Sequence, residues 1–282
     1  MMPLPQFSAV DKLIDLALEE DIAAGDITTD YLVTPGTRAT GLIVAKEPVV
    51  VAGLEVARRI FQRLDSQVVC HTPAVDGETL TQGQALLTLE GELGPMLIAE
   101  RTALNFLQRL SGIATHVRRY VDAVAGTPVR LLDTRKTTPG WRILEKYAVR
   151  IGGASNHRMG LYDGVLIKDN HIAACGGITA AVQKIKANVS HLVKIEVETA
   201  DLDQVREALA CGADVIMLDN MTAEQIRAAV NLIQHRALVE VSGNVTLDKL
   251  KALAVTGVDL ISIGALTHAA RSVDLSMRIA AK

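Results

Sequence analysis

The chain has 282 residues, of which 49% are hydrophobic and 3% aromatic. This length allows one large domain or two ordinary ones, and the balance is typical of α/β packing by aliphatic side chains. The formal net charge of -3 argues against a nucleic-acid or membrane-surface partner, because both attract a global excess of Lys and Arg. Any basic binding site must therefore be local.

The cysteines and the N-terminus indicate the compartment. Cys70, Cys175 and Cys211 cannot all pair within the chain and show no C-x-x-C spacing, so a reducing environment is favoured over a disulfide framework. The N-terminus lacks a basic flank before a continuous apolar core, and apolar runs elsewhere fall far short of the ~20 residues that cross a bilayer. We therefore expect a cytoplasmic protein with no membrane partner.

The first third of the chain predicts its own α+β domain. A helical pattern near the N-terminus is followed by a turn at Asp26, β-rich runs over residues 41–53, a helix over 54–64 and short alternating pieces over 72–93. Glycines between the alternating pieces indicate antiparallel strands. Few candidate catalytic groups lie here, which favours a scaffolding or subunit-contact role.

Pro95 then opens a long helical pattern. Its apolar stripe contains Leu97 and Leu104, and the i+4 and i+3 spacings place Arg101 on the same stripe. A guanidinium among apolar side chains needs a carboxylate, a ligand or a partner chain. From position alone, a structural ion pair and a functional role for Arg101 are both open.

After residue 127, six apolar strand-like runs alternate with helical stretches. This alternation predicts parallel strands joined by helical crossovers. A barrel is favoured over a doubly wound sheet, because no G-x-G-x-x-G follows the first strand and charged residues close nearly every strand. Eight units do not fit, so we expect an incomplete (β/α) barrel, followed by a terminal helix over residues 270–282.

Cations follow the first two of these strands. Arg135, Lys136, His157, Arg158 and Lys168 lie within a few dozen residues of one another, interleaved with aspartates. The C-terminal ends of parallel strands are where α/β folds open their sites. These side chains therefore predict a pocket for an anionic ligand.

Carboxylates follow the later strands. Glu196 and Glu198 lie on one face of a strand, Asp219 ends the next, and Glu240 lies near the end of the strand after that. Charged groups inside a barrel are costly unless they pair or reach its mouth. We expect an arc of carboxylates that faces the cationic pocket, with a structural salt-bridge network as the alternative for any single acid.

Two short loops of small residues, at 242–244 and 263–265, follow the last two strands. Backbone N–H groups of such loops bind phosphate, and in (β/α) barrels this site commonly follows the last strands. The sequence has no P-loop consensus, H-E-x-x-H or clustered Cys/His ligands, which argues against nucleotide hydrolysis by that route and against zinc hydrolysis. A phosphorylated sugar and a polyanion would together use all three sub-sites, and the carboxylates could bind ribose hydroxyls and hold Mg²⁺ through water.

Several motifs resemble those of the quinolinate phosphoribosyltransferase family. They are DTRKT at 133–137, NHRMGLYDG at 156–164, IKDNH at 167–171, EVET at 196–199 and MLDN at 217–220. EDIAAGDITT near the N-terminus and ERTALNFLQRLSGIAT in the long helix are also similar. The resemblance therefore spans nearly the whole chain.

The resemblance implies an α+β sandwich over residues 1–112, on which the segment 270–282 packs back, and an incomplete α/β barrel over 113–269. It implies phosphoribosyl transfer from phosphoribosyl pyrophosphate to quinolinate with decarboxylation, which gives nicotinate mononucleotide, pyrophosphate and CO2 in de novo NAD synthesis. The implied cofactor is Mg²⁺. The implied partners are the two substrates and a second copy of the chain, in a homodimer whose active sites are shared between subunits and whose further assembly is left open.

The resemblance also assigns roles to residues. Arg135, His157, Arg158 and Lys168 would bind the quinolinate carboxylates, with Arg101 donated by the neighbouring subunit. Catalytic roles fall to Lys136, between the two substrates, and to Glu198 and Asp219, which would also hold Mg²⁺ indirectly. The residues that would bind phosphoribosyl pyrophosphate are Thr134, Lys136, Glu198, Asp219, Ser242, Gly243, Asn244, Ile263, Gly264 and Ala265. Asn244 stands where many family members carry a further glycine, which affects the detail of this loop.

Three alternatives remain at this point. The first is a paralogue with the same fold and another substrate, although the complete set of cations suits a dicarboxylate. The second is a barrel lyase that forms a Schiff base on Lys136 or Lys168. The third is a phosphosugar-binding regulator that has no catalytic turnover.

Overall fold

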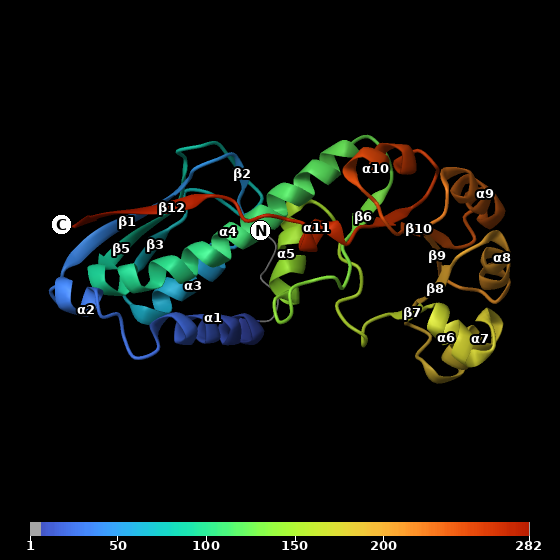
Figure 1. The fold of residues 1–282 in the computed structure, drawn as a ribbon, viewed down its shortest axis with the longest axis horizontal. Helices are drawn as coiled ribbons and strands as arrows, with labels where there is room; N and C mark the ends of the chain where they lie inside the picture. The colour runs from blue at the N-terminus through green and yellow to red at the C-terminus, as the bar shows by residue number, and fades with distance from the viewer. Residues whose placement is uncertain (1–6, 282) are drawn as a thin grey trace. The chain divides into compact units, whose positions relative to one another are not determined.

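The computed structural model describes residues 7–281, which form two compact units (Figure 1). Unit 1 contains the chain up to Arg118, Thr137–Gly153 and the chain from Ala269 onward. Unit 2 contains Arg119–Lys136 and Ala154–His268. The two units thus alternate along the sequence. The sequence prediction placed residues 1–112 together with segment 270–282 in one domain and residues 113–269 in the other.

An antiparallel sheet with strand order β12-β1-β5-β3 forms the centre of unit 1, beside a separate pair, β2 with β4. Buried and partly exposed side chains alternate along much of β1, as expected for a sheet with one covered face. The strands are β1 (Arg38–Ala45), β2 (Val49–Val50), β3 (Val69–His71), β4 (Thr79–Leu80), β5 (Ala85–Glu92) and β12 (Leu275–Ala281). The helices are α1 (Phe7–Ile22), α2 (Thr29–Leu32), α3 (Leu54–Leu64), α4 (Leu93–Ala123), which continues into unit 2, and α5 (Arg142–Gly152).

The prediction of a terminal helix over residues 270–282 is wrong, because this segment contains strand β12. The strand pairs antiparallel with β1, in a register that runs from Ala45 opposite Leu275 to Ala39 opposite Ala281. Leu275 is buried and Met277 and Ile279 are partly buried, whereas Arg278 and Ala280 are exposed. This alternation has the period of a strand, and the unpaired edge of β1 supplies the partner that stabilises it.

Helix α5 belongs to unit 1 although it lies between two strands of unit 2 in the sequence. The Trp141 ring stacks on Phe106 of α4 with centroids 4.5 Å apart. The Arg109 guanidinium pairs with the fully buried Glu145 carboxylate at 2.6 Å. Because these contacts bind α5 to α4, the predicted crossover helix is grouped with the antiparallel unit.

Unit 2 is a parallel sheet of six strands in the order β6-β11-β10-β9-β8-β7. Within residues 7–281 its two end strands, β6 and β7, do not pair with each other, so the sheet confirms the expected incomplete barrel. The strands are β6 (Arg130–Leu132), β7 (Val165–Ile167), β8 (Ile195–Thr199), β9 (Val215–Asp219), β10 (Leu238–Ser242) and β11 (Leu260–Ser262). The first four residues of β9 are all buried, as expected for a parallel strand covered on both faces.

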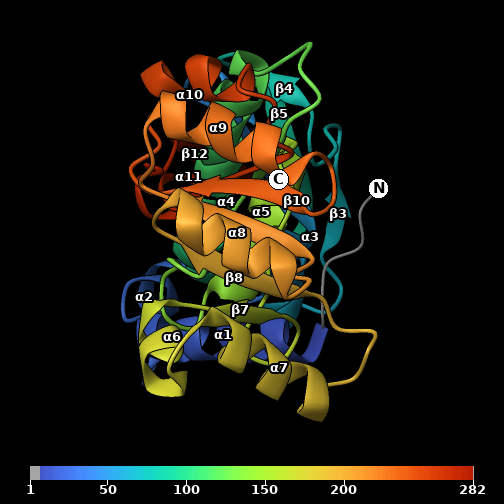
Figure 2. The same ribbon diagram turned by 90° about the vertical axis from the view of Figure 1, so that its right-hand side faces the viewer.

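Helices cover the outer face of this sheet, and Figure 2 shows α8 and α9 outside the strands. The helices of unit 2 are α6 (Asp169–Cys175), α7 (Ile178–Asn188), α8 (Leu202–Ala210), α9 (Ala223–Ile233), α10 (Leu247–Ala254) and α11 (Ala265–His268). Asp201 and Thr222 begin α8 and α9 by accepting hydrogen bonds from the backbone N–H groups of Gln204 and Gln225, which satisfies donors in the first helical turn. No helix among residues 7–281 is long and apolar enough to span a membrane.

Candidate active site

A cavity of about 620 Å³ opens at the C-terminal ends of the parallel strands of unit 2. Each strand contributes its last residues or the loop that follows it, which explains why residues far apart in the sequence line one space. The lining residues are Thr134, Arg135, Lys136, His157, Arg158, Leu166, Lys168, Glu198, Met217, Asp219, Asn220, Ser242, Gly243, Asn244, Ser262 and Gly264.

Arg135 and Arg158 give one part of the cavity its positive charge. The Arg158 Nη1 group donates to the carbonyl oxygen of Gly164 at 3.0 Å, which fixes the guanidinium from one end. Burial lowers the pKa of Arg158, and the charge of Arg135 acts in the same direction, whereas Glu196 and Asp163 act against it. An arginine stays protonated at neutral pH, so two cations that disfavour each other lie side by side at the cavity, where an anion would offset their repulsion.

Lys168 and Glu198 form an ion pair across the mouth of the cavity. The Lys168 Nζ lies 2.7 Å from Glu198 Oε2, and the lysine side chain is 47% exposed. Lys168 directly follows β7, and Glu198 lies near the end of the adjacent strand β8. Because the lysine is exposed to solvent, the pair contributes little to stability, and its ammonium group can exchange Glu198 for a ligand.

Lys136 is held against the loop that follows β11. The Thr267 hydroxyl donates to the Lys136 carbonyl oxygen at 2.7 Å. A Cβ at Gly264 would lie 2.7 Å from Lys136 Cδ, so the glycine leaves room for the lysine side chain where it passes. The aliphatic part of Lys136 therefore lies beside the predicted phosphate loop.

The other predicted phosphate loop is joined to Asp219 by two asparagines. Asn220 Nδ2 donates to Asp219 Oδ2 at 2.9 Å, and Asn244 Nδ2 donates to Asn220 Oδ1 at 3.1 Å. Asn220, Gly243 and Asn244 have positive φ angles of 53°, 96° and 47°, a region that glycine and asparagine tolerate best. Asn244 thus fits the left-handed backbone that the loop requires at that position.

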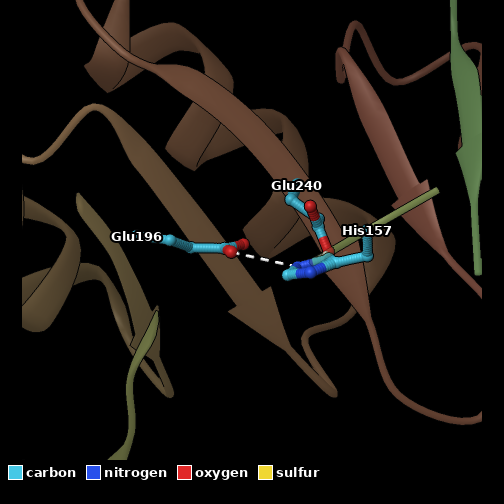
Figure 3. A group of neighbouring side chains, drawn as sticks. All are labelled: His157, Glu196 and Glu240. Atoms are coloured by element: carbon cyan, nitrogen blue, oxygen red, sulfur yellow. Dashed lines mark ion pairs between the residues drawn. The ribbon is translucent and has the colours of Figure 1, made fainter. Parts of the chain in front are cut away.

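His157, which lines the cavity and is partly buried, lies beside the buried carboxylates of Glu196 and Glu240 (Figure 3). His157 Nε2 lies 3.0 Å from Glu196 Oε2 and 3.6 Å from Glu240 Oε1. Glu196 is 7% exposed and Glu240 is 1% exposed. Burial, followed by the charge of Glu196, raises the pKa of Glu240 to about 7, although His157 acts against the shift.

Asp133 fixes the segment that carries His157. Its Oδ1 atom accepts the backbone N–H of His157 at 2.8 Å, and its Oδ2 atom accepts Asn156 Nδ2 at 2.6 Å. Asp133 is fully buried after β6, and a buried carboxylate requires such donors. This carboxylate therefore has a structural role at the base of the cation cluster.

Three residues to which the resemblance assigns roles do not line the cavity: Arg101, Ile263 and Ala265. Glu196 and Glu240, two acids of the predicted carboxylate arc, do not line it either. Ile263 is buried and donates its backbone N–H to the Leu132 carbonyl oxygen at 2.9 Å. Arg101 is exposed on α4 in unit 1, so its predicted place inside an apolar stripe is wrong. The paired arginine of this helix is Arg109, two turns further on, which contacts Glu145.

Sequence reasoning missed Asn220, Ser262, Leu166 and Met217 as lining residues. The alternation of side chains along a strand could have found two of them, because Met217 shares a strand face with Asp219, and Leu166 shares one with Lys168. Asn220 could also have been predicted, because an asparagine directly after the last residue of a strand is typical of a turn at the strand end.

Comparison with known proteins identifies the family. Models of the quinolinate phosphoribosyl transferase N-terminal and C-terminal domains match residues 26–111 and 113–278. The probable nicotinate-nucleotide pyrophosphorylase [carboxylating] of Synechocystis is 48% identical and covers 99% of this chain and 95% of its own length. The nicotinate-nucleotide pyrophosphorylase [carboxylating] of Mycobacterium leprae is 43% identical, over 96% of this chain and 98% of its own.

Solved structures agree over the whole fold. NadC from Streptococcus pyogenes is 40% identical, with a TM-score of 0.96 over 100% of both chains. The nicotinate-nucleotide pyrophosphorylase from Francisella tularensis is 38% identical, with a TM-score of 0.93 over 99% of this chain and 98% of its own. The chain belongs to the quinolinate phosphoribosyltransferase family.

Proposed function

We infer that the chain transfers a phosphoribosyl group from phosphoribosyl pyrophosphate to quinolinate with decarboxylation, and so acts as a pentosyltransferase of NAD biosynthesis. Its products are nicotinate mononucleotide, pyrophosphate and CO2. Family membership supports this activity. The observation that carries it is a single cavity in which cations after β6 and β7 lie opposite carboxylates and small-residue loops after β8 to β11.

Quinolinate binds at the cationic part of the cavity. Arg135, Arg158 and Lys168 supply three positive charges there, and the substrate carries two adjacent carboxylates. Guanidinium groups bind carboxylates through paired N–H donors in a fixed plane. This binding holds the pyridine nitrogen toward the ribose and raises the rate through orientation.

The phosphoribosyl group binds on the other side. Glu198 and Asp219 accept hydrogen bonds from the ribose hydroxyls, and Thr134 and Lys136 lie between the two substrates. The loops at 242–244 and 263–265 bind the 5′-phosphate through their backbone N–H groups. Gly243 and Gly264 support this assignment, since both line the cavity at points where a side chain would collide with Asn220 or Lys136.

The donor set of this side fits Mg²⁺. Glu198 and Asp219 both line the cavity and offer carboxylate oxygens, the ligand type that this ion prefers. Because Lys168 already contacts Glu198 Oε2, these carboxylates would hold the ion indirectly, through water that Mg²⁺ retains. When bound, Mg²⁺ would neutralise charge on the departing pyrophosphate.

The reaction requires no covalent enzyme nucleophile. The pyridine nitrogen forms a bond to the anomeric carbon as the bond from that carbon to pyrophosphate breaks, and the carboxylates stabilise the cation that develops there. The alkylated ring then accepts the electron pair released when the adjacent carboxylate departs as CO2. A proton replaces that carboxylate on the ring carbon.

We also propose that two copies of the chain form a homodimer with shared sites, in which Arg101 of each subunit binds quinolinate in the cavity of the other. The exposure of Arg101 on α4, outside the residues that line the cavity, supports this arrangement. The same function predicts a cytoplasmic enzyme.

Release of labelled CO2 tests the proposed function. Quinolinate labelled at the carboxyl group adjacent to the ring nitrogen should release CO2 only when phosphoribosyl pyrophosphate is present, with one pyrophosphate for each CO2. Turnover of nicotinate without CO2 would indicate another member of the fold. Borohydride trapping of a substrate adduct on Lys136 or Lys168 would instead favour a Schiff-base lyase.

A further inference from the structure

Two asparagines lie between the end of β9 and the loop at 242–244. β9 and β10 are neighbouring parallel strands, and Asp219 stands opposite Ser242 in their register. The ladder continues for one more residue, because the Asn220 backbone N–H donates to the Ser242 carbonyl oxygen at 3.1 Å. The carboxylate proposed for the ribose and the loop proposed for the phosphate therefore begin side by side, and the side chains of Asn220 and Asn244 join them.

The hydrogen bonds between these side chains run in one direction. Asn220 Nδ2 donates to Asp219 Oδ2 at 2.9 Å, and Asn244 Nδ2 donates to Asn220 Oδ1 at 3.1 Å. A carboxylate only accepts hydrogen bonds, so Asp219 requires the NH2 group of Asn220. The Asn220 oxygen then faces Asn244, which must present its own NH2 group. The carboxylate thus determines how both amides are oriented.

The backbone around these side chains adopts an uncommon conformation. The φ angles of Asn220 and Asn244 are 53° and 47°, in the left-handed region where few residues other than glycine are found. Gly243 lies between the two loops with a φ of 96°, and a Cβ there would collide with the Asn220 amide. Left-handed residues gather at functional sites, and here they reserve the space in which the Asn220 amide lies.

The far end of this chain of hydrogen bonds can reach a phosphate. An amide NH2 group carries two N–H donors, so Asn244 can donate one to Asn220 and the other to a phosphate oxygen beside the backbone N–H groups of its loop. Asp219, Asn220 and Asn244 all line the cavity. A bound phosphate would hold the Asn244 amide, and through Asn220 it would hold the Asp219 carboxylate in one orientation.

We propose that Asn220 is a positioning residue that orients the Asp219 carboxylate toward the ribose hydroxyls, and that Asn244 couples this orientation to the 5′-phosphate. Asn220 acts through Asp219 and contacts no reacting atom. The phosphate and the hydroxyls of one ligand therefore reinforce each other's binding, because the phosphate end fixes the carboxylate that the hydroxyls use. The identity of the ligand, a phosphorylated ribose, rests on the proposed function.

Calorimetric titration of the full chain with two sugar phosphates gives the direct test. Ribose 5-phosphate carries the hydroxyls, whereas tetrahydrofurfuryl phosphate has the same ring and phosphate without them. We expect Asn220→Gly to weaken the binding of ribose 5-phosphate about tenfold with little change for tetrahydrofurfuryl phosphate, as one lost hydrogen bond to a carboxylate implies. Asn244→Gly should weaken the binding of both, because its amide also contacts the phosphate.

The same titrations can contradict the proposal. Equal losses for the two sugar phosphates in Asn220→Gly would show that this residue only shapes the loop, and would overturn its positioning role. Failure of the unsubstituted chain to bind either compound would overturn it as well. Glycine adopts a positive φ freely, so Asn220→Gly removes the amide without straining the backbone.

A double substitution tests whether Asn220 acts through Asp219. Once Asp219→Ala has removed the carboxylate, the further change Asn220→Gly should cause no additional loss of affinity for ribose 5-phosphate, because residues that act as one unit are not additive. A further loss of about tenfold, equal to that of Asn220→Gly alone, would contradict the proposal.

Matched variants control for the fold. Gln234→Gly changes an exposed residue with a φ of 51° at the end of α9 and should leave both affinities unchanged. Asn220→Asp keeps an oxygen for Asn244 but loses the donor to Asp219, so it should show the same selective loss if Asn220→Gly fails to fold, as judged by thermal unfolding. Failure of the unsubstituted chain to release labelled CO2 would contradict the proposed function, whereas the sugar-phosphate titrations test the role of Asn220 separately.

Discussion

The two sides of the cavity differ in how their residues are held. The cations lie on the loop that follows β6 and on the loops that precede and follow β7, the two end strands of the sheet, and Arg135 and Lys168 are exposed. The acids and small-residue loops follow β8 to β11, where β9 and β10 are paired on both edges and hydrogen bonds join Asp219 to the loop at 242–244. Under the proposed function, this difference gives an adaptable side for the acceptor and a fixed side for the phosphoribosyl group.

The largest effect is expected from Arg158→Ala. Loss of one charged partner of a bound carboxylate costs roughly 3–4 kcal/mol, which corresponds to a decrease of about a hundredfold to a thousandfold in kcat/KM for quinolinate. Steady-state kinetics with each substrate varied measure it. Arg227→Ala, a substitution of an exposed arginine of α9, is the control. A similar loss of activity in both variants would show that the effect is not specific to the cations of the cavity.

A mixture of two inactive variants tests whether the cationic side is completed by another chain. Arg101→Ala and Lys136→Ala should each be nearly inactive alone. After unfolding and refolding together in equal amounts, half of the dimers are mixed and each mixed dimer has one intact site, so activity should return to about a quarter of the unsubstituted value. No recovery, with mixed dimers detected by mass spectrometry, would contradict a shared site.

Gly243→Ala tests the fixed side. Its φ is 96°, and a Cβ would collide with the Asn220 amide, so the substitution strains the loop and displaces a neighbour. We expect the KM for phosphoribosyl pyrophosphate to rise about tenfold or more with little change for quinolinate, as a loss of ~1.4 kcal/mol or more at one sub-site implies. Gly36→Ala is a matched control, since φ is 80° there and a Cβ would meet nothing within 4 Å.

Lys168→Ala should weaken the binding of quinolinate, the acceptor, more than the binding of phosphoribosyl pyrophosphate, the donor. Removal of the ammonium group frees Glu198 from its ion pair and should raise the quinolinate KM about tenfold, with a smaller rise for phosphoribosyl pyrophosphate. Lys249→Ala, an exposed lysine of α10, should change neither. If the phosphoribosyl pyrophosphate KM rises more, Lys168 belongs to the other side.

The smallest expected effect concerns stability and pH. The pKa of Glu240 is raised from 4.5 to about 7, so the folded state binds this proton more tightly than the unfolded chain does. The resulting stabilisation is complete below pH 4.5 and is lost as the pH rises through about 7. Glu240→Gln should therefore flatten the decrease in free energy of unfolding across this window, measured by denaturant titration, whereas the exposed Glu92→Gln should not. Unchanged curves would show that Glu240 stays ionised.

The sequence predicted the parallel half of the fold well because its signal is local and repeated. Six apolar runs closed by charged residues define strand ends, and strand ends in one sheet converge, which brought Arg135, Glu198 and Asp219 into one predicted site. The terminal strand β12 was mistaken for a helix because its stability depends on pairing with β1, a partner more than two hundred residues away. Such non-local pairing leaves a weak pattern in seven residues.

The contacts that individual side chains make were harder to predict than the strand ends at which those side chains lie. His157 was grouped with the cations because histidine can be charged, whereas its ring contacts, the Arg158 N–H at Nδ1 and a Glu196 carboxylate oxygen 3.0 Å from Nε2, involve groups that meet only in the folded chain. Arg101 was placed inside an apolar stripe by helical spacing, but its exposure depends on what packs against α4. Asn220 and Asn244 contact each other across two loops, a pairing that spacing along the sequence does not reveal.

A crystal structure with quinolinate and an unreactive analogue of phosphoribosyl pyrophosphate tests the division of the cavity most directly. We predict that the dicarboxylate lies among Arg135, Arg158 and Lys168, with the 5′-phosphate at residues 242–244 and 263–265 and the ribose hydroxyls at Glu198 and Asp219. A dicarboxylate bound at the small-residue loops, or a 5′-phosphate bound at Arg135 and Arg158, would contradict the account.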